Sequence, residues 1–252
     1  MSKGQHSKTG VWVAADFRDN LIIDRYDPMF AGMRASKIKH LRSANSEDAL
    51  TWNVFRSLRQ IDPANWLPDL FRSAFEHRAA PPSTHATVEL WQSVPPPPSL
   101  VLLGDEGESE VDIVIDAPDW VWFIEAKLGS DVSQGTTTRP DRDQVLRNVD
   151  VGSWYAGVRP FYFSLLIRDG SSTPNGVALV AKYAQLSATR ELLAGHRPDG
   201  LVNLHGVSLL RWDQVAEVLR AAQESAARPA EASFASRALE WLRERGIARG
   251  AG

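Results

Sequence analysis

Three charged side chains lie near the ends of two strongly apolar segments of this chain. Asp112 lies near the start of the first segment, and Glu125 and Lys127 end the second. Alternate residues of a strand share a face, so Glu125 and Lys127 would project together, about 6–7 Å apart, with Ala126 turned away. A carboxylate buried at such a position stays ionised only if it is paired, hydrogen-bonded or bound to a metal. The pattern therefore predicts a polar site with metal-binding or acid–base chemistry.

The two apolar segments, residues 109–115 and 120–127, are separated by a short polar stretch. This stretch contains Pro118 and Asp119, residue types that favour turns. The simplest interpretation is an antiparallel hairpin, which would bring Asp112 to Glu125 and Lys127. Both segments are rich in Val, Ile, Phe or Trp and neither has a polar face, so we expect the hairpin to be central in a sheet and covered on both sides.

Lysine is scarce in this chain, which has six lysines and twenty-two arginines. Lys127 is the only lysine between His40 and Lys182 in the sequence. An ammonium group is a compact charge whose pKa falls on burial, whereas a guanidinium stays protonated and demands a planar partner. A lysine at this position therefore indicates a chemical requirement for the ammonium. The alternative is a structural ion pair of Lys127 with Asp112 or Glu125.

In order and spacing, these residues resemble the PD-(D/E)XK nuclease superfamily, which includes many restriction endonucleases and repair or defence nucleases. In that superfamily an aspartate opens the second core strand and an acid-x-lysine lies on the third, positions that Asp112, Glu125 and Lys127 fit. The sequence departs from the pattern at Val111, which stands in place of the proline, and this weakens a subfamily assignment more than membership. The resemblance covers about residues 43–168.

The resemblance also implies a glutamate on a helix that precedes the hairpin. Residues 45–58 predict such a helix, because Asn45 or Ser46 is a good N-cap and apolar residues follow at helical spacing. Glu47 in its first turn is the candidate site residue. The alternative is that Glu47 only complements the helix dipole, which Asp48 could do equally well.

A glutamine on a following helix would complete the superfamily's site. Residues 143–155 predict this helix, and Gln144 matches the glutamine. Gln144 and Asn148 are four residues apart and share a face, and an exposed amide pair is the alternative interpretation. A buried strand over residues 161–167 then gives the order helix, hairpin, helix, strand, which matches the superfamily's core.

We therefore expect an α/β protein with a restriction-endonuclease-like core, a central mixed β-sheet flanked by helices, and additional N- and C-terminal helices. It is expected to form a single domain over residues 1–252, with a core at about 43–222 and a C-terminal helical extension at about 223–252. Further predicted elements are strands at 86–91 and 206–210, helices at 182–195, 213–222 (capped by Asp213) and 233–245, and loops at 79–83, 95–98, 135–140 and 170–176. A stripe of Phe234, Ala238, Trp241 and Leu242 in the last helix is suited to core packing or to a dimer contact.

The composition fits one compact enzyme. At 252 residues, with 43% hydrophobic content and nine tryptophans, the chain can bury one substantial core. No apolar run reaches the eighteen residues of a membrane span and the start is polar, so we expect a soluble, cytoplasmic protein. The absence of cysteine excludes disulfides and thiolate zinc sites, and the six histidines lack a paired ligand spacing. A metal, if used, is expected to have oxygen ligands.

The net charge of −3 gives no basic footprint for nucleic acid and decides little. A local basic run precedes the helix of Glu47 and contains Arg34, Lys37, Lys39, His40 and Arg42. Near the predicted site this run could hold phosphates, although a solvated helix face is the commoner explanation.

The resemblance implies phosphodiester hydrolysis with Mg²⁺, for which Mn²⁺ can substitute. Asp112 and Glu125, with Glu47 and the backbone carbonyl of Ala126, would hold the ion. The ion would neutralise charge on the phosphate and lower the pKa of a bound water. Lys127 would orient or help deprotonate that water, and Gln144 would position substrate or water.

The leading hypothesis is thus a metal-dependent nuclease acting on nucleic acid, DNA in preference to RNA, with restriction or phage defence as a role suggested by the resemblance alone. A homodimer stays open, and double-strand cutting would favour one. The second hypothesis is a nucleic-acid-binding or scaffold protein that keeps the fold without turnover. The third is an unrelated α/β protein whose strand-end charges form a salt-bridged cluster, which would gain no stability from Mg²⁺ or Mn²⁺.

Overall fold

The computed structural model describes residues 3–76, 85–102, 107–135 and 140–248. Within it the chain forms two compact units. The sheet unit is the continuous segment Pro68–Arg211, and the helical unit combines Met1–Leu67 with Trp212–Gly252. The division falls at neither boundary expected from the sequence, and the interpretation of residues 1–252 as a single domain stays a prediction.

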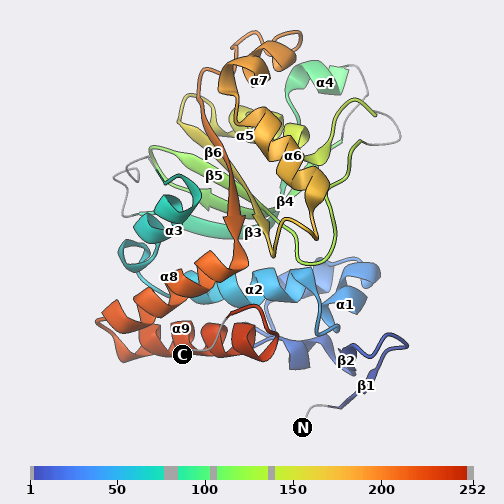
Figure 1. Ribbon diagram of the computed structural model, residues 1–252, viewed down its shortest axis with the longest axis vertical. Helices are drawn as coiled ribbons and strands as arrows, with labels where there is room; N and C mark the ends of the chain where they lie inside the picture. The colour runs from blue at the N-terminus through green and yellow to red at the C-terminus, as the bar shows by residue number, and fades with distance from the viewer. Residues whose placement is uncertain (1–2, 77–84, 103–106, 136–139, 249–252) are drawn as a thin grey trace. The chain divides into compact units, whose positions relative to one another are not determined.

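The sheet unit contains a five-stranded mixed sheet flanked by helices, which confirms the predicted α/β class (Figure 1). In spatial order its strands are β3 (Thr87–Val94), β4 (Ser109–Asp116), β5 (Val121–Ala126), β6 (Phe161–Ile167) and β7 (Leu204–Arg211). The first three strands are antiparallel, and β5, β6 and β7 are parallel. The described helices of this unit are α3 (Leu67–Ala74), α4 (Pro98–Leu102), α5 (Gln144–Ala156), α6 (Pro174–Tyr183) and α7 (Leu186–Leu193).

The predicted hairpin is confirmed as β4 and β5. The two strands pair antiparallel from Asp116 opposite Val121 to Ile113 opposite Ile124. All six residues of β5 are buried, since neighbouring strands lie on both sides and helices on both faces. This burial explains why β5 lacks the alternation of polar and apolar residues that a half-exposed strand has.

Alternate side chains of the central strands face different helices. On one face Phe123 and Phe161 pack together beneath α5, where Gly152 allows a close approach. A Cβ atom at Gly152 would lie 2.1 Å from the ring of Phe161, so this glycine is required for the packing. On the other face Phe71 of α3 contacts the ring of Trp122. The sheet is therefore a middle layer, which fixes α5 against the strands that carry the candidate site.

Strand β3 is irregular where it passes Asp112. Leu90 pairs with Ile113 and Gln92 with Val111, but Trp91 between them has a φ of +52°. This left-handed conformation is an outlier for a bulky residue and costs on the order of 1–2 kcal/mol. The regular pairing of β3 with β4 is thus interrupted opposite Asp112.

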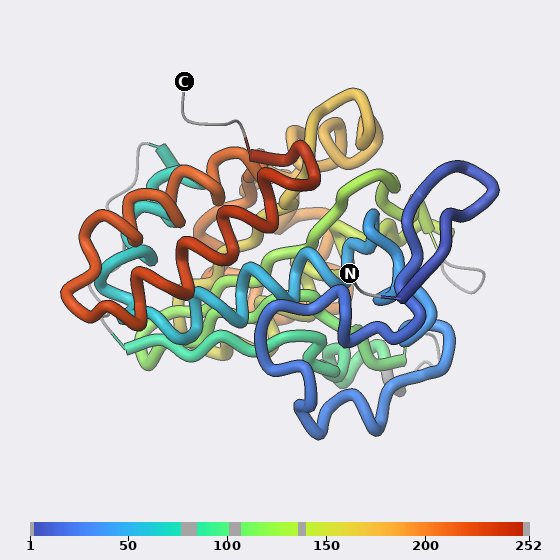
Figure 2. Tube along the Cα trace, turned by 90° about the horizontal axis from the view of Figure 1, so that it is seen from below, coloured from blue at the N-terminus to red at the C-terminus, as the bar shows by residue number. Residues whose placement is uncertain are grey.

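The helical unit is dominated by three helices that pack side by side: α2 (Glu47–Leu58), α8 (Trp212–Ser225) and α9 (Pro229–Glu244) (Figure 2). It also contains α1 (Ala35–Leu41), a two-stranded sheet of β1 (Gly4–His6) and β2 (Trp12–Ala14), and 3₁₀ turns at Phe17–Asn20, Pro28–Gly32 and Pro63–Asn65. The predicted cap of α2 is confirmed, because Ser46 accepts a hydrogen bond from the N–H of Ala49. On α9, Ala238, Trp241 and Leu242 are buried within this unit.

Three predicted elements differ in the structure. The helix expected at 182–195 is two helices, because α6 ends at Tyr183 and α7 begins at Leu186. Helix α6 begins at Pro174, so residues 174–176 are helical, although they belong to the loop predicted at 170–176. Helix α8 begins at Trp212, so Asp213 lies in its first turn instead of capping it.

Two of the predicted loops lie wholly or mostly outside the described residues. The loop predicted at 79–83 lies outside them, as does most of the loop at 135–140. Among the helices of the described part of the chain, none is long and apolar enough to span a membrane.

Candidate functional site

Asp112 lies where β4 loses its regular pairing on both sides. On the β3 side the interruption is at Trp91, and on the β5 side pairing extends only to Ile113 and Ile124. Beyond that pair, the Oδ2 atom of Asp112 accepts a hydrogen bond from the backbone N–H of Ala126 at 2.9 Å. The Asp112 carboxylate therefore lies against the backbone that joins Glu125 to Lys127.

Glu125 and Lys127 project from the same face, as the strand period predicts. The Nζ atom of Lys127 is 2.8 Å from Oε1 of Glu125, and the two residues are only 7% and 3% exposed. The next strand holds this end of β5, since the N–H of Lys127 donates to the carbonyl of Leu166 at 2.7 Å. Two buried charges at a strand end are thus fixed against one another.

Helix α5 supplies two amides to the same carboxylate. The Nε2 atom of Gln144 lies 2.5 Å from Oε1 of Glu125, and the Nδ2 atom of Asn148 lies 2.9 Å from Oε2. One helical turn separates Gln144 from Asn148, so both amides point to one place. The alternative of an exposed amide pair is wrong for Asn148, which is 2% exposed.

The Gln144 amide is engaged at both ends. Its Oε1 atom accepts a hydrogen bond from the N–H of Ser133 at 3.2 Å, while its backbone N–H donates to the carbonyl of Ser133 at 2.9 Å. These contacts join the segment after β5 to the first residue of α5. Gln144 therefore connects the Glu125 carboxylate to the backbone of Ser133.

The N-terminus of α5 is anchored by Asp143. Its Oδ1 atom caps the helix by accepting from the N–H of Leu146 at 2.9 Å, and its Oδ2 atom accepts from the hydroxyl of Tyr183 at 2.5 Å. Burial and the neighbouring Asp143 carboxylate raise the pKa of Tyr183 well above its ordinary value, so the phenol stays a donor. The helix that carries Gln144 and Asn148 thus begins at a fixed point.

The side chains of this group are of the kind that a metal site uses. The carboxylates of Asp112 and Glu125 are brought to the backbone of Ala126 and to the ammonium of Lys127. Magnesium prefers oxygen ligands and is commonly bound by one or two carboxylates with several waters. Among the described residues, no group of three or more His, Cys, Asp and Glu is arranged to hold a metal. The donor set present is two carboxylates with the backbone carbonyl of Ala126 nearby, which suits Mg²⁺ or Mn²⁺ in kind.

Glu47 is the first residue of α2 and belongs to the helical unit, whereas Asp112, Glu125, Lys127 and Gln144 belong to the sheet unit. Its first-turn position favours the helix dipole, as the alternative interpretation expects. A role for Glu47 in the site stays a prediction.

The basic run before α2 is divided by its contacts. Lys37 forms an ion pair with Asp48, and the Nε atom of Arg42 donates to the carbonyl of Ala14. Arg34, Lys39 and His40 are exposed on or next to α1. Only these three remain available to a phosphate in solution.

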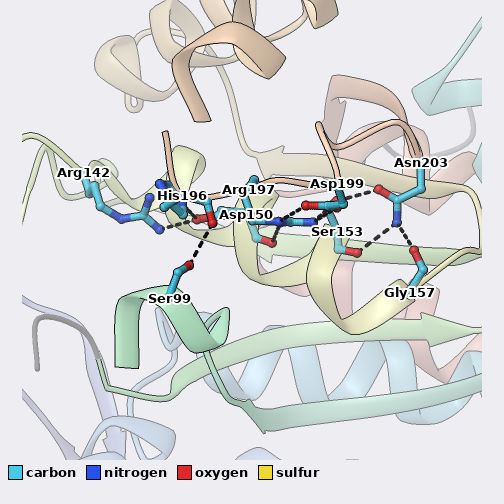
Figure 3. Close-up of polar contacts among 9 residues, drawn as sticks. All are labelled: Ser99, Arg142, Asp150, Ser153, Gly157, His196, Arg197, Asp199 and Asn203. Carbon is cyan, nitrogen blue, oxygen red and sulfur yellow. Dashed lines mark hydrogen bonds and ion pairs between the residues drawn. The ribbon is translucent and has the colours of Figure 1, made fainter. Parts of the chain in front are cut away.

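A second buried carboxylate was not found by sequence reasoning. Asp150 on α5 is fully buried, and Figure 3 shows it within a network of polar contacts. Its Oδ2 atom accepts from Arg142 at 2.9 Å and lies 2.7 Å from Nε2 of His196, and its Oδ1 atom accepts from Arg197 at 2.8 Å. Burial opposes ionisation, but His196, Arg197 and the charge of Arg142 outweigh it and hold the pKa of Asp150 below its ordinary value. This group is named the Asp150 cluster.

Other polar residues extend the Asp150 cluster. Arg197 also pairs with Asp199 and donates to Ser153, and the Ser153 hydroxyl in turn donates to Asn203 at 2.6 Å. Arg142 lies only eight residues from Asp150, a separation that could have signalled the pair, but His196 and Arg197 lie 46 and 47 residues away. No local pattern marks such distant partners.

Comparisons of the chain with protein-family models, curated proteins and solved structures found no match.

Proposed function

We propose that this protein is a metal-dependent nuclease that hydrolyses phosphodiester bonds of DNA at the site formed by Asp112, Glu125 and Lys127. The observation that carries the proposal is the buried contact between Glu125 and Lys127, with Asp112 held against the intervening backbone. Two carboxylates can bind Mg²⁺, and a lysine beside them can offset the charge of a phosphate, which together suit phosphodiester hydrolysis.

The order of the elements supports a restriction-endonuclease-like core. The antiparallel strands β4 and β5 are followed by α5 and then by β6, which lies parallel to β5. The chain thus has the hairpin, helix and strand of the resemblance in the same order. A cytoplasmic location, where DNA and Mg²⁺ are both accessible, is part of the proposal.

Each residue of the site has a distinct role in the proposed reaction. Asp112 and Glu125 hold the cation with their oxygens, and Lys127 offsets phosphate charge and orients the attacking water. When bound, Mg²⁺ neutralises charge on the phosphate and makes its water more acidic. Because Lys127 is only 7% exposed and contacts Glu125, its ammonium is already oriented before substrate binds.

The test is cleavage of plasmid and single-stranded DNA by the purified full-length chain with Mg²⁺, Mn²⁺ or EDTA. Lys127→Ala and Asp112→Ala are each expected to lose at least about a thousandfold in rate, or roughly 4 kcal/mol of barrier. Lys8→Ala is the matched control, because Lys8 is exposed in the turn between β1 and β2. Its rate is expected to stay near that of the wild type.

Two results would contradict the proposal. One is wild-type protein that cleaves neither substrate and shows no rise in melting temperature with Mg²⁺ or Mn²⁺. The other is cleavage that persists in EDTA or in Lys127→Ala. In either case Glu125 and Lys127 would be a structural ion pair of the sheet.

A further inference from the structure

The carboxylate of Glu125 has an unequal set of donors. Its Oε1 atom accepts from Lys127 and from Gln144, whereas its Oε2 atom accepts only from Asn148 among the contacts described above. A carboxylate offers about four lone-pair positions, so three donors leave room for one more electrophile. The orientation of the remaining position depends on how the amides hold the group.

Asn148 is too buried to act on a substrate directly. It is 2% exposed on the face of α5 that covers the sheet, and its Nδ2 atom is 2.9 Å from Glu125. The described contact of its amide is with the Glu125 carboxylate. Any part it plays in the chemistry must pass through the Glu125 carboxylate.

The neutrality of Asn148 also matters. A guanidinium at this position, as around Asp150, would add a second positive charge to the Glu125 carboxylate beside Lys127 and oppose the binding of a cation. A neutral amide satisfies the buried oxygen without adding charge. Groups that hydrogen-bond a metal ligand fix its orientation, and their loss commonly weakens metal binding by 10–100-fold.

We propose that Asn148 is a positioning residue that holds the Glu125 carboxylate in the orientation required to bind a divalent cation. Gln144 assists from the other oxygen, so its amide serves Glu125 and the Ser133 segment instead of the substrate. This inference rests on the proposed function, because it assumes that Glu125 is a metal ligand.

The experiment measures Mn²⁺ binding to the full-length protein without nucleic acid. The protein is treated with chelator and dialysed, then titrated with MnCl₂ in a calorimeter, and its melting temperature is recorded in parallel. Wild type is compared with Asn148→Ala and with Asn148→Leu, which fills a similar volume and offers a folded variant if the alanine variant unfolds. Asp112→Asn provides the reference for loss of a proposed ligand.

Ser153→Ala is the matched control for stability. Ser153 lies on the same helix, is buried, and loses its hydrogen bonds to Asn203 and Arg197 in this variant without any change at Glu125. We expect Asn148→Ala and Asn148→Leu to weaken Mn²⁺ binding at least about tenfold. Ser153→Ala is expected to bind within about threefold of wild type despite a lower melting temperature, since single polar deletions of this kind cost about 1–3 kcal/mol of stability.

The outcomes separate the two proposals. If wild type binds Mn²⁺ and the Asn148 variants bind equally well, the positioning inference is wrong while the proposed function stands. If Ser153→Ala loses as much affinity as Asn148→Ala, the loss follows general stability and the inference is again wrong. If wild type binds no Mn²⁺, the metal site itself is absent and both proposals fail.

Discussion

Helix α5 contacts two buried carboxylates that are held in opposite electrostatic settings. Each accepts three side-chain contacts, but Glu125 has one ammonium and two neutral amides, whereas Asp150 has two guanidinium groups and a histidine. The same number of contacts therefore leaves a carboxylate balanced by a single ammonium at one position and a carboxylate surrounded by cations at the other. The comparison teaches that the kind of donor, more than its number, sets the electrostatic environment of a buried carboxylate, and the proposed function requires the environment found at Glu125.

The largest expected effect is a difference in the unfolding free energy that is lost when each carboxylate is replaced by an amide. Asp150→Asn leaves Arg142 and Arg197 buried without a negative partner at this position, which is expected to cost about 3–5 kcal/mol of unfolding free energy. Glu125→Gln is expected to cost less, about 1–3 kcal/mol, because it removes the carboxylate from one buried cation, whereas Asp150→Asn removes it from two. Urea unfolding of both variants measures the difference. Equal losses would break the comparison.

The second expected effect is metal-dependent stability. Mn²⁺ at a hundred times its dissociation constant should raise the unfolding free energy of wild type by about 2.7 kcal/mol. Glu125→Gln should abolish this rise, and Asp199→Asn should retain it, because Asp199 pairs with Arg197 in the Asp150 cluster. Unfolding curves with and without Mn²⁺ provide the measurement. A rise that survives in Glu125→Gln would place the cation elsewhere.

The third expected effect is a loss of unfolding free energy at acid pH, which arises from protonation of Asp150. Its pKa is held below the ordinary value of 3.8, so the ionised form stabilises the fold above that value, and the contribution is lost as the pH falls through the folded-state pKa. The stability advantage of wild type over Asp150→Asn should therefore shrink as the pH falls below 3.8. Each unit of pKa difference corresponds to about 1.4 kcal/mol. Urea unfolding over a pH series checks this, and a constant advantage at acid pH would contradict it.

The smallest expected effect is that of removing a tyrosine hydroxyl that donates to an aspartate. Tyr183→Phe removes the hydroxyl contact to Asp143 and should cost about 1.5 kcal/mol. It should also weaken Mn²⁺ binding a few-fold, because Asp143 caps the helix that positions Gln144.

Tyr155→Phe is the control for Tyr183→Phe, since its hydroxyl donates to Asp116 at 2.6 Å, away from Glu125. It should lower the melting temperature without changing Mn²⁺ affinity. Equal losses of affinity in Tyr155→Phe and Tyr183→Phe would show that the cap at Asp143 has no special connection to the site.

The elements with strong local signals could be predicted from the sequence. The hairpin follows from a proline-containing turn between β-branched and aromatic residues, and α5 follows from Asp143 and an apolar spacing. The contact of Lys127 with Glu125 follows from the strand period alone. These features depend on residues a few positions apart, which a sequence displays directly.

Other features depend on distant residues and could not be predicted. Helix α6 is capped from outside, because Asp131 accepts from the N–H groups of Asn175 and Gly176, more than forty residues away. The left-handed backbone of Trp91 is imposed by the sheet and contradicts the preference of a tryptophan. The Asp150 cluster also depends on distant residues, because His196 and Arg197 lie 46 and 47 residues from Asp150.

The division of the chain into two units has a consequence for the order in which a newly made chain can fold. The sheet unit is one continuous segment, whereas α2 of the helical unit packs against α9, which the ribosome adds only after the whole sheet unit has been made. Because domains generally fold as units during synthesis, we expect the strands around Glu125 to assemble while α2 still waits for its partner. During that interval the face of α2 that packs against α9 would lack its C-terminal cover, and transiently exposed apolar surface is prone to aggregation.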